Sequence, residues 1–243
     1  MQNKTVLITG AAGRIGAEIA RTLHADDMDV IIHYNRSGTQ ASALADELNA
    51  ARHDSAMAVQ GNLLDDGALA ATIETAYGFG NRLDALVNNA SSFYPTPVAS
   101  ATTEQWEDLV GTNMKAPFFL SQHAAPYLRE QKGCIINITD IYADRPLGQY
   151  PVYSAAKAGL AMLTKALAKE LAPEVRVNAI APGAILWPEG MSNNSKDLVI
   201  SRTALGHAGN PIDIASAVRF LIRDAGYMTG QILTIDGGRS LNF

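Results

Sequence analysis

The sequence predicts one α/β domain in which a doubly wound parallel sheet carries helices on both faces. Short β-branched runs alternate with longer segments rich in Ala and Leu, and this alternation is typical of parallel strands joined by helical crossovers. The runs VLIT (6–9) and ALVNN (85–89) are apolar without a polar alternation, as expected for strands that are covered on both faces. With 243 residues and 47% hydrophobic content, the chain is long enough for one large core.

We expect about seven strands, each a short run rich in β-branched residues. In chain order the predicted strands are Thr5–Thr9, Val30–Tyr34, Ala56–Gln60, Ala85–Asn88, Cys134–Ile138, Arg176–Ala181 and Gln231–Ile235. The segments between them are predicted helices, most clearly at 15–25, 40–52, 67–78 and 154–172. The sequence shows no repeat, low-complexity tract or linker, so residues 1–243 are expected to form a single domain.

One long stretch, Pro182–Gly209, is rich in Gly, Asn, Ser and Pro. A loop of this length in a compact domain is usually a functional lid or partly mobile. It follows a strand and must therefore emerge at the carboxyl edge of the sheet, where ligands bind in folds of this kind. We predict a substrate lid over 182–209. Within it, Trp187 and Met191 either cover the substrate or simply pack.

Composition argues against several kinds of partner and site. The chain carries 19 basic and 24 acidic residues and no basic block, which argues against nucleic acid as the main partner. Cys134 is the only cysteine, so no internal disulfide can form, and the five His lack ligand spacing, so we expect no metal site. No run of about 18 apolar residues and no leader pattern is present, so we expect no membrane span and a cytoplasmic protein.

A glycine-rich turn, Thr9–Gly16, follows the first predicted strand and opens a helix. Small residues in such a turn let the backbone approach a pyrophosphate, and the free N–H groups of the helix point at it. Arg14 lies in the first helical turn, where a cation opposes the helix macrodipole unless an anionic ligand is nearby. We therefore assign Gly10, Arg14, Ile15 and Gly16 to a dinucleotide cofactor. The alternative for Arg14 is a solvated surface residue.

The second strand ends without the acidic residue that would hold the ribose 2′-hydroxyl of NAD(H). Arg36 and Ser37 offer a guanidinium and a hydroxyl at this point, and these groups suit a 2′-phosphate. Together with Arg14 they favour NADP(H), whereas the alternative is an ordinary polar loop. The residues assigned to this side of the cofactor are His33, Tyr34, Asn35, Arg36, Ser37, Asn62 and Leu63.

The fourth strand ends in Asn89, Ala90 and Ser91, whose small side chains would leave room for the cofactor ribose. Phe93 follows on the same loop. An exposed aromatic ring beside a cofactor predicts a stacking surface for a flat heterocycle. The alternative is a small aromatic cluster that packs the loop.

Tyr153 and Lys157 are four residues apart, so their side chains share one face of a helix. An ammonium beside a phenol lowers the pKa of the phenol and makes it a usable proton donor or acceptor near neutral pH. Asn113 falls in a helical stretch, where Asn is disfavoured, and we expect it to distort the helix or to hold a water. The alternative for Asn113 is a surface residue.

Asp140 lies thirteen residues before Tyr153. A hydroxyl at this position would only hold a carbonyl oxygen by a hydrogen bond, whereas a carboxyl group can also carry a proton. Asp140 therefore predicts a substrate whose reacting atom is protonated, such as a ring nitrogen. Burial would favour the neutral acid and Lys157 the carboxylate, and the sequence leaves this choice open.

These motifs together resemble those of the short-chain dehydrogenase/reductase family over essentially the whole chain. The shared features are the T-G-A-A-G-R-I-G turn, the N-N-A segment, Asn113, Y-x-x-x-K, P-G at 182–183 and the final D-G-G. Two departures resemble the pteridine reductase branch, because Arg14 stands where the family usually has Gly and Asp140 where it has Ser. HYNRS (33–37) and NNASSFYPTP (88–97) are also similar to that branch.

The resemblance implies a Rossmann-type fold, NADPH as the cofactor and the reduction of pterins, in some members also of folates. It implies that Phe93 sandwiches the pterin against the nicotinamide and that Ser91 contacts both. It also implies a homotetramer in which the C-terminal tail, with Arg239, reaches the site of a neighbouring subunit. The remaining assignments are Pro182, Gly183 and Ile185 for the cofactor and Arg14, Leu186, Trp187 and Met191 for the substrate.

The resulting hypothesis is hydride transfer to the carbon of a pterin C=N bond, with a proton delivered to the adjacent nitrogen. Tyr153 is the expected donor, Lys157 tunes it and holds the nicotinamide ribose, and Asp140 replenishes the proton or donates it through a water. One alternative is a carbonyl or quinone reductase of the same family, against which a carboxylate beside a developing oxyanion argues. The other is a non-catalytic NADP(H)-binding sensor.

Overall fold

A seven-stranded parallel sheet forms the centre of the protein, with the strand order β3-β2-β1-β4-β5-β6-β7. The computed structural model describes residues 3–187 and 190–241. The strands are β1 (Thr5–Ile8), β2 (Asp29–Tyr34), β3 (Ala56–Gln60), β4 (Ala85–Asn88), β5 (Cys134–Ile138), β6 (Arg176–Pro182) and β7 (Ile232–Ile235). All seven predicted strands are present, and the predicted parallel α/β architecture is confirmed.

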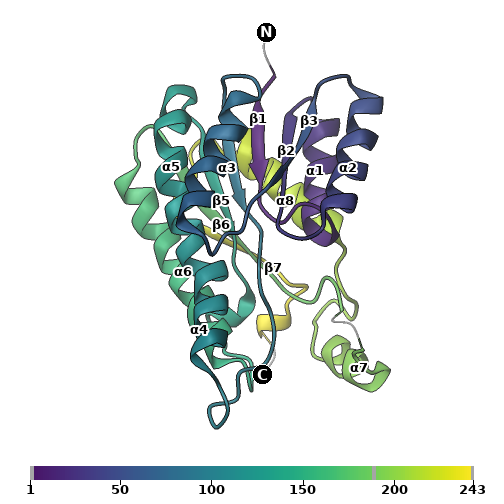
Figure 1. Cartoon of the computed structure of the whole chain (residues 1–243). Helices are drawn as coiled ribbons and strands as arrows, with labels where there is room; N and C mark the ends of the chain where they lie inside the picture. The colour runs from purple at the N-terminus through teal and green to yellow at the C-terminus, as the bar shows by residue number, and fades with distance from the viewer. Residues whose placement is uncertain (1–2, 188–189, 242–243) are drawn as a thin grey trace.

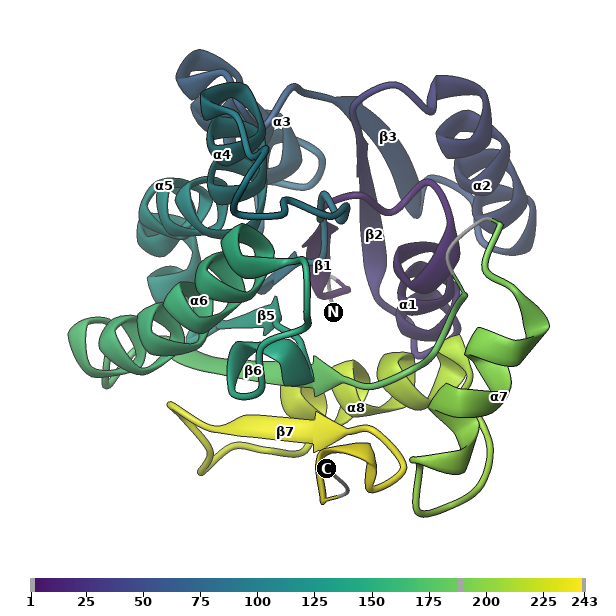
Figure 2. The same ribbon diagram turned by 90° about the horizontal axis from the view of Figure 1, so that it is seen from below.

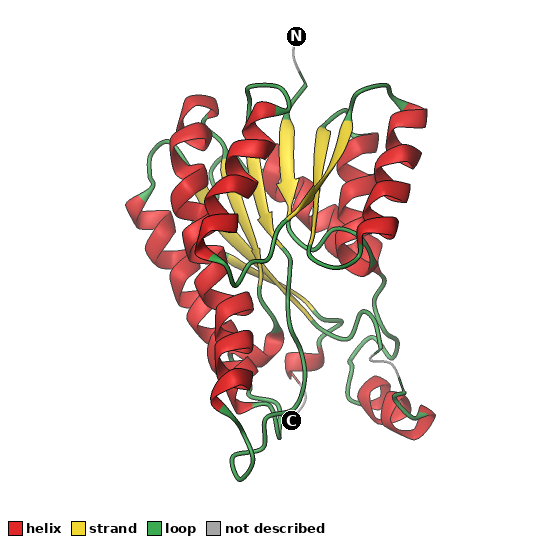
Figure 3. Ribbon diagram, in the orientation of Figure 1, coloured by secondary structure: helices red, strands yellow, loops and turns green. Residues whose placement is uncertain are grey.

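Helices cover both faces of the sheet (Figures 1 and 3). They are α1 (Arg14–Ala25), α2 (Gly38–Ala51), α3 (Asp66–Gly78), α4 (Thr103–Val110), α5 (Ala116–Gln131), α6 (Pro151–Glu170), α7 (Asn193–Ser201) and α8 (Pro211–Arg223), with the short turns η1 (Gly111–Lys115), η2 (Ile141–Ala143) and η3 (Arg239–Leu241). One face packs against α1, α2 and α8, and the other against α3, α5 and α6. Within the described residues, no helix combines the length and the apolar character needed to cross a membrane.

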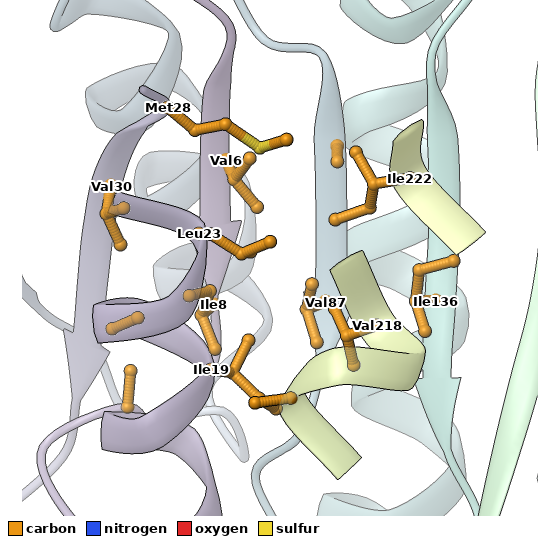
Figure 4. Packing of buried hydrophobic residues seen from close by; sticks show 14 of the residues in the cluster. Val6, Ile8, Ile19, Leu23, Met28, Val30, Val87, Ile136, Val218 and Ile222 are labelled. Carbon is orange, nitrogen blue, oxygen red and sulfur yellow. The ribbon is translucent and has the colours of Figure 1, made fainter. Parts of the chain in front are cut away.

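The strand side chains point alternately into two hydrophobic cores, one on each face of the sheet. On β1, Val6 and Ile8 enter the core below α1 and α8, whereas Leu7 enters the core below α3 and α5. Figure 4 shows the first of these cores, in which Ile8 lies near Val87 of β4 and Val218 of α8. Because every residue of β1 is buried on one side or the other, the strand is apolar throughout and lacks a polar alternation.

The chain reverses its direction across the sheet between β1 and β4, since β1 to β3 extend toward one edge and β4 to β7 toward the other. At such a switch point the loops that follow the two strands diverge, and the crevice between them is where ligands bind in open α/β sheets. Figure 2 looks onto this carboxyl edge, beside which α7 and the C-terminal turn lie.

A π-helical turn, η1, interrupts the helical run between α4 and α5. Asn113 is fully buried in its middle, and its side-chain Nδ2 donates to the carbonyl oxygen of Leu109 at 2.9 Å. The π-helical turn is the helix distortion that the sequence predicted at Asn113. Single π-helical turns inside helices occur frequently at functional sites.

The predicted lid region contains the helix α7, which the sequence did not predict. Its N-cap residue Ser192 accepts a hydrogen bond from the backbone N–H of Ser195 at 3.2 Å, and this satisfies one of the free donors at the helix start. No residue of α7 is buried, so the helix lies on the surface without a core-facing stripe. Residues 188–189 of the predicted lid lie outside the described residues.

Candidate active site

Segments that are far apart in the sequence meet at the carboxyl edge of the sheet. The glycine-rich turn follows β1, Asn89 follows β4, Asp140 follows β5 and Gly183 follows β6. Because the carboxyl ends of neighbouring parallel strands lie side by side, all of these segments lie at one edge of the sheet (Figure 2). The space beside this edge, which we call the crevice, is the candidate active site.

The glycine-rich turn is packed too closely for larger residues. Gly10 has φ +61°, and a Cβ there would lie 2.9 Å from the Cα of Ala90. A Cβ on Gly16 would lie 2.6 Å from the carbonyl oxygen of Gly10 and 2.7 Å from Nδ2 of Asn89. Asn89 itself donates from Nδ2 to the carbonyl oxygens of Thr9 at 2.8 Å and Gly10 at 3.1 Å. The Asn89 side chain therefore holds the turn in shape.

The N-terminus of α1 has free backbone donors. Gly13 is the N-cap and has no side-chain oxygen to accept them, and the first turn contains no acidic residue. Arg14 is exposed, has φ +55° and makes no ion pair with any described residue. A left-handed conformation in a residue other than Gly costs on the order of 1–2 kcal/mol. Free N–H groups and a cation at this position suit an anionic ligand.

His33 is buried, and its ring stabilises the same turn. Its Nδ1 accepts a hydrogen bond from the backbone N–H of Gly10 at 3.2 Å, and its Nε2 lies 3.0 Å from the carbonyl oxygen of Gly61. A carbonyl can only accept, so the ring proton is on Nε2. Burial lowers the pKa of His33 to about 4, which keeps the ring neutral. His33 therefore contributes to a cofactor site indirectly, through Gly10.

The end of β2 presents exposed polar residues at the start of α2. Asn35, Arg36 and Ser37 are exposed, and Ser37 is the N-cap of α2 without using its hydroxyl for a capping bond. The hydroxyl and the guanidinium thus remain available for a phosphate. Asn62 accepts from the N–H of Leu64 at 3.2 Å. Leu63 is a core residue, because its side chain is 8% exposed and packs in the core below α3 and α5.

Asp140, Tyr153 and Lys157 meet at the end of β5. The phenol of Tyr153 donates to Oδ2 of Asp140 at 2.7 Å, and Oδ1 of Asp140 accepts from the backbone N–H of Tyr142 at 2.9 Å. Lys157 donates from Nζ to the carbonyl oxygen of Ile138 at 2.9 Å, and Nζ lies 5.7 Å from the centre of the Tyr153 ring. The shared helix face predicted for Tyr153 and Lys157 is thus present, but the hydrogen-bond partner of the phenol is Asp140.

Burial has the largest effect on the Asp140 carboxyl and raises its pKa above the ordinary value. Hydrogen bonds from Tyr142 and Tyr153 and the charges of Lys157 and Arg239 act in the opposite direction without reversing the shift. The choice between burial and Lys157, which the sequence left open, is therefore decided by burial. Asp140 is a carboxyl that takes up a proton more readily than an exposed one.

The prediction that Lys157 lowers the pKa of Tyr153 was wrong for this structure. Burial raises the pKa of Tyr153 well above 10, and the charge and hydrogen bond of Asp140 add to the increase, whereas a hydrogen bond with Ser91 lowers it. Burial also lowers the pKa of Lys157 to about 8, against the attraction of Asp140. Tyr153 therefore stays protonated near neutral pH, and its hydroxyl donates a hydrogen bond to Asp140.

Asn113 connects the π-helical turn to the loop after β4. Its Nδ2 also donates to the carbonyl oxygen of Ser92 at 2.9 Å, and its Oδ1 accepts from the hydroxyl of Ser91 at 2.6 Å. The surface alternative for Asn113 was wrong, because the residue is fully buried. Its amide holds the loop that carries Phe93.

Phe93 packs in an aromatic cluster, and its role as a stacking surface for a heterocycle stays a prediction. Its ring stacks on Tyr150 with centroids 4.7 Å apart and an interplanar angle of 15°, and it meets Tyr153 edge to face at 4.8 Å. Phe93 nevertheless remains 40% exposed. It packs in an aromatic cluster and still offers apolar surface beside the Tyr153 phenol.

Asp108 of α4 anchors the residues on either side of Phe93. Tyr94 donates from its hydroxyl to Oδ2 of Asp108 at 2.8 Å, and Ser92 donates to Oδ1 at 3.3 Å. Sequence reasoning missed both Asp108 and Tyr150. The position of Tyr150, three residues before Tyr153 at the start of α6, was a local signal, whereas nothing in the sequence linked Asp108 to the loop.

The residues after β6 divide into core and surface positions. Gly183 packs against the chain after β7, since a Cβ there would lie 2.7 Å from the Cα of Asp236. Ile185, which was assigned to the cofactor, is buried in the core below α1 and α8. Leu186 is 37% exposed and Trp187 is partly exposed, as a substrate-facing position requires. Met191 is also partly exposed.

The C-terminal turn reaches the end of α7 within the same chain. Nη1 of Arg239 donates to the carbonyl oxygen of Val199 at 2.9 Å. The charge of Arg239 also acts on Asp140, whose pKa it lowers. Contact of Arg239 with a neighbouring subunit stays a prediction.

Known proteins match this chain over almost its whole length. The family model described as "Enoyl-(Acyl carrier protein) reductase" matches residues 10–240. "Pteridine reductase 1" of Leishmania tarentolae is 36% identical over 97% of this chain and 96% of that protein. "3-oxoacyl-[acyl-carrier-protein] reductase FabG" of Staphylococcus aureus (strain Mu50 / ATCC 700699) is 35% identical over 97% of both chains. A "3-oxoacyl-[acyl-carrier-protein] reductase" of Synechocystis sp. is 35% identical over 97% of this chain and 96% of that protein.

These relatives differ in the substrate that their names state, yet they are similar to this chain to almost the same extent. An identity of 36% against 35% does not separate a reductase named for pteridines from reductases named for 3-oxoacyl groups. The choice between the two depends on the side chains at the crevice.

Proposed function

This chain belongs to the short-chain dehydrogenase/reductase family of oxidoreductases, and we propose that it is an NADPH-dependent reductase of pterins. In this proposal a dihydropterin becomes a tetrahydropterin, and dihydrofolate is a second substrate. One observation carries the proposal: the phenol of Tyr153 donates to a buried carboxyl group, Asp140, at 2.7 Å. A phenol that is hydrogen-bonded to a carboxyl forms a two-group path for a proton. The reduction of a ring C=N bond requires such a proton at the nitrogen.

The residues at the crevice fit NADPH. Gly10 and Gly16 form a turn whose close contacts leave no room for a Cβ, and the uncapped start of α1 offers N–H groups to a pyrophosphate. Arg14 opens α1, and Arg36 and Ser37 follow β2, so two exposed guanidinium groups and a hydroxyl would be available to a 2′-phosphate. Lys157 would hold the nicotinamide ribose. When bound, NADPH supplies a hydride to the substrate.

The chain's own groups supply the proton. Reduction of C=N adds a hydride to carbon and a proton to nitrogen, so the product gains one C–H and one N–H bond. The Tyr153 hydroxyl is protonated near neutral pH and is the group that would give its proton to the nitrogen. The raised pKa of Asp140 makes this carboxyl able to return a proton to the phenol from solvent.

The exposed part of Phe93 would orient a flat ring. Its ring lies edge to face with Tyr153, so a heterocycle resting on Phe93 would lie close to the phenol. Holding the reacting ring at a defined distance from the proton donor removes much of the entropic cost of the reaction. Ser91, exposed on the same loop, would contact the pterin and the cofactor.

A second candidate function is the reduction of a ketone, as in the relatives named for 3-oxoacyl groups. Those relatives are 35% identical, and this similarity favours the candidate. Asp140 argues against it, because the negative charge of a carboxylate would destabilise the oxyanion that develops when a carbonyl is reduced.

Turnover of a small substrate panel tests the proposal. NADPH and, in parallel, NADH are offered with a dihydropterin, dihydrofolate, a simple ketone and an acetoacetyl thioester. We expect oxidation of NADPH with the dihydropterin, slower reaction with NADH and no reaction with the ketone. Asp140→Ser, which introduces the residue more usual in the family, should reduce turnover of the dihydropterin.

Two outcomes would contradict the proposal. Rapid turnover of the acetoacetyl thioester with none of the heterocycles would show a ketone reductase. Tight NADPH binding without turnover of any substrate would indicate a sensor that has kept the cofactor site alone.

A further inference from the structure

The chain after β7 forms a short segment, residues 236–241, which we call the tail. Two consecutive glycines shape it, since Gly237 has φ +62° and Gly238 has φ +78°. A Cβ on Gly237 would lie 2.9 Å from Cγ2 of Thr203, and a Cβ on Gly238 would lie 2.7 Å from the Cβ of Ala204. The tail therefore packs directly on the chain that leaves α7.

Backbone hydrogen bonds hold the tail in this position. Oδ1 of Asp236 accepts from the N–H of Gly238 at 2.9 Å, and Oδ2 accepts from the N–H of Ser240 at 2.7 Å. The N–H of Leu205 donates to the carbonyl oxygen of Gly237 at 3.0 Å. These bonds form a rigid base for the side chain of Arg239, which stands between Gly238 and Ser240.

Arg239 is the side chain that joins the tail to α7 itself. Its Nη1 donates to the carbonyl oxygen of Val199 at 2.9 Å, and the same oxygen accepts from the hydroxyl of Thr203 at 2.9 Å. Val199 lies in the last turn of α7, where its carbonyl oxygen also accepts from the backbone N–H of Arg202 at 3.3 Å and where the helix dipole attracts a cation. No residue of α7 is buried, so polar contacts of this kind take the place of a hydrophobic anchor.

Among the described residues, Arg239 has no carboxylate within ion-pair distance. The carbonyl oxygen of Val199 is therefore the acceptor that holds its guanidinium.

We propose that Arg239 is a positioning residue that fixes the end of α7 to the tail. The proposal stands on the hydrogen bonds and the packing of the tail.

Hydrogen exchange tests this proposal without any substrate. The protein is saturated with NADP⁺, and amide exchange is followed in 193–205 for the wild type and for Arg239→Met. Loss of the charged hydrogen bond should accelerate exchange in this segment roughly tenfold, while exchange in α1 stays unchanged. Lys196→Met is the matched control, because it removes a cation from α7 that makes no side-chain hydrogen bond or ion pair with the described residues; it should leave exchange as in the wild type.

Two conservative variants test whether the hydrogen bond is the cause. Arg239→Gln keeps an N–H donor and loses the charge, and Arg239→Lys keeps both a donor and the charge. Exchange in α7 should stay slow in both variants.

The outcomes are distinct. Unchanged exchange in 193–205 for Arg239→Met, in a protein whose melting temperature is that of the wild type, would overturn the positioning role. If no pterin is reduced, the proposed function fails, yet the exchange experiment still decides whether Arg239 holds α7.

Discussion

Asp140 and Tyr153 owe their behaviour to burial more than to their neighbours in the sequence. They share a hydrogen bond of 2.7 Å, and burial raises the pKa of both groups. The raised pKa of Tyr153 keeps the phenol protonated near neutral pH, and the raised pKa of Asp140 lets the carboxyl take up a proton more readily than an exposed one. Both effects suit the transfer of a proton to a substrate nitrogen. The two groups form a coupled pair, so the proton belongs to the pair and not to one residue.

Replacing Asp140 with Asn should abolish most of the turnover and leave NADPH binding nearly unchanged. The amide still accepts from the N–H of Tyr142 but cannot carry a proton. We expect kcat for the dihydropterin to fall by roughly 10²–10⁴, the usual size of a general acid–base contribution. Steady-state kinetics and a fluorescence titration with NADPH measure the two effects. Loss of NADPH binding in Asp140→Asn would show that the carboxyl is structural.

The pKa of Lys157, lowered to about 8 by burial, predicts opposite effects of pH on activity and stability. Because Lys157 is charged only below that value, activity that needs the ammonium should decline as pH rises through about 8. In the unfolded chain the pKa is about 10.4, so between these values the unfolded state binds more protons and the contribution of Lys157 to stability should rise with pH. Rate profiles and thermal unfolding from pH 6 to 10 measure both, with Lys157→Met as the reference. A wild-type rate that keeps rising above pH 9 would contradict this.

The loop after β4 is an element whose shape depends on two distant anchors. Asn113 of the π-helical turn holds Ser91 and Ser92, and Asp108 of α4 holds Ser92 and Tyr94. Phe93 lies between these anchored positions. The orientation of its ring is therefore a property of the loop and of α4 together.

Asp108→Ala should loosen this loop and weaken the binding of a flat substrate. Both hydrogen bonds beside Phe93 are lost, so we expect KM for the dihydropterin to rise by roughly tenfold, the effect of losing about 1.4 kcal/mol of hydrogen bonding, while the Kd of NADPH stays constant. Tyr94→Phe removes one of the two bonds and should give a smaller increase. An unchanged KM in both variants would mean that Phe93 is held by Tyr150 alone.

The start of α1 combines backbone strain with the residues that we propose to bind NADPH. Arg14 has φ +55°, a conformation that Gly adopts without strain. Arg14→Gly should therefore stabilise the free protein by about 1 kcal/mol and weaken NADPH binding. Arg14→Ala is the matched control, since it loses the cation and keeps the strained Cβ, so it should bind NADPH weakly without the gain in stability. Thermal unfolding and an NADPH titration measure both, and a Gly variant with unchanged melting temperature would refute the strain.

The whole molecule presents large apolar side chains that a single chain leaves uncovered. Trp106 on α4 is 50% exposed, Met162 on α6 is 64% exposed and Phe220 on α8 is 40% exposed. Exposed apolar surface on more than one element favours association through more than one contact, and a tetramer with two kinds of interface fits this pattern.

Light scattering in solution should give a mass four times the 25.8 kDa of one chain. Phe220→Glu places a charge on one exposed apolar face and should reduce the mass to that of a smaller assembly. Leu198→Glu, on the exposed surface of α7, is the control and should not change it. A wild-type mass of 25.8 kDa would contradict the homotetramer.

The elements that local patterns describe were predicted closely. The seven strands agree with the structure within one or two residues at each end, because buried parallel strands are apolar throughout and are bounded by turn residues. The glycine-rich turn was also predicted from the sequence, and the structure shows that Gly10 and Gly16 occupy positions without space for a Cβ. The shared face of Tyr153 and Lys157 followed from helix geometry alone.

The predictions that stayed open concern burial and partners far along the chain. His33 and Ile185 were both assigned to the cofactor, and the structure shows that His33 holds Gly10 and that Ile185 packs in the core. Their contact with a cofactor stays a prediction. Helix α7 was not predicted, because a short surface helix without a buried stripe leaves no apolar period to read.

The amino-acid sequence by itself determined the parallel sheet, its carboxyl edge and the residue types collected there, since periodicity and glycine turns depend on a few neighbouring residues. Only the tertiary structure decided which group shares a hydrogen bond with Asp140, which rings Phe93 packs against and which helix Arg239 contacts. Those properties depend on desolvation and on contacts between segments that are distant in the chain, such as Arg239 with Val199 and Tyr94 with Asp108. Folding must bring such groups together before their pKa values and orientations are defined.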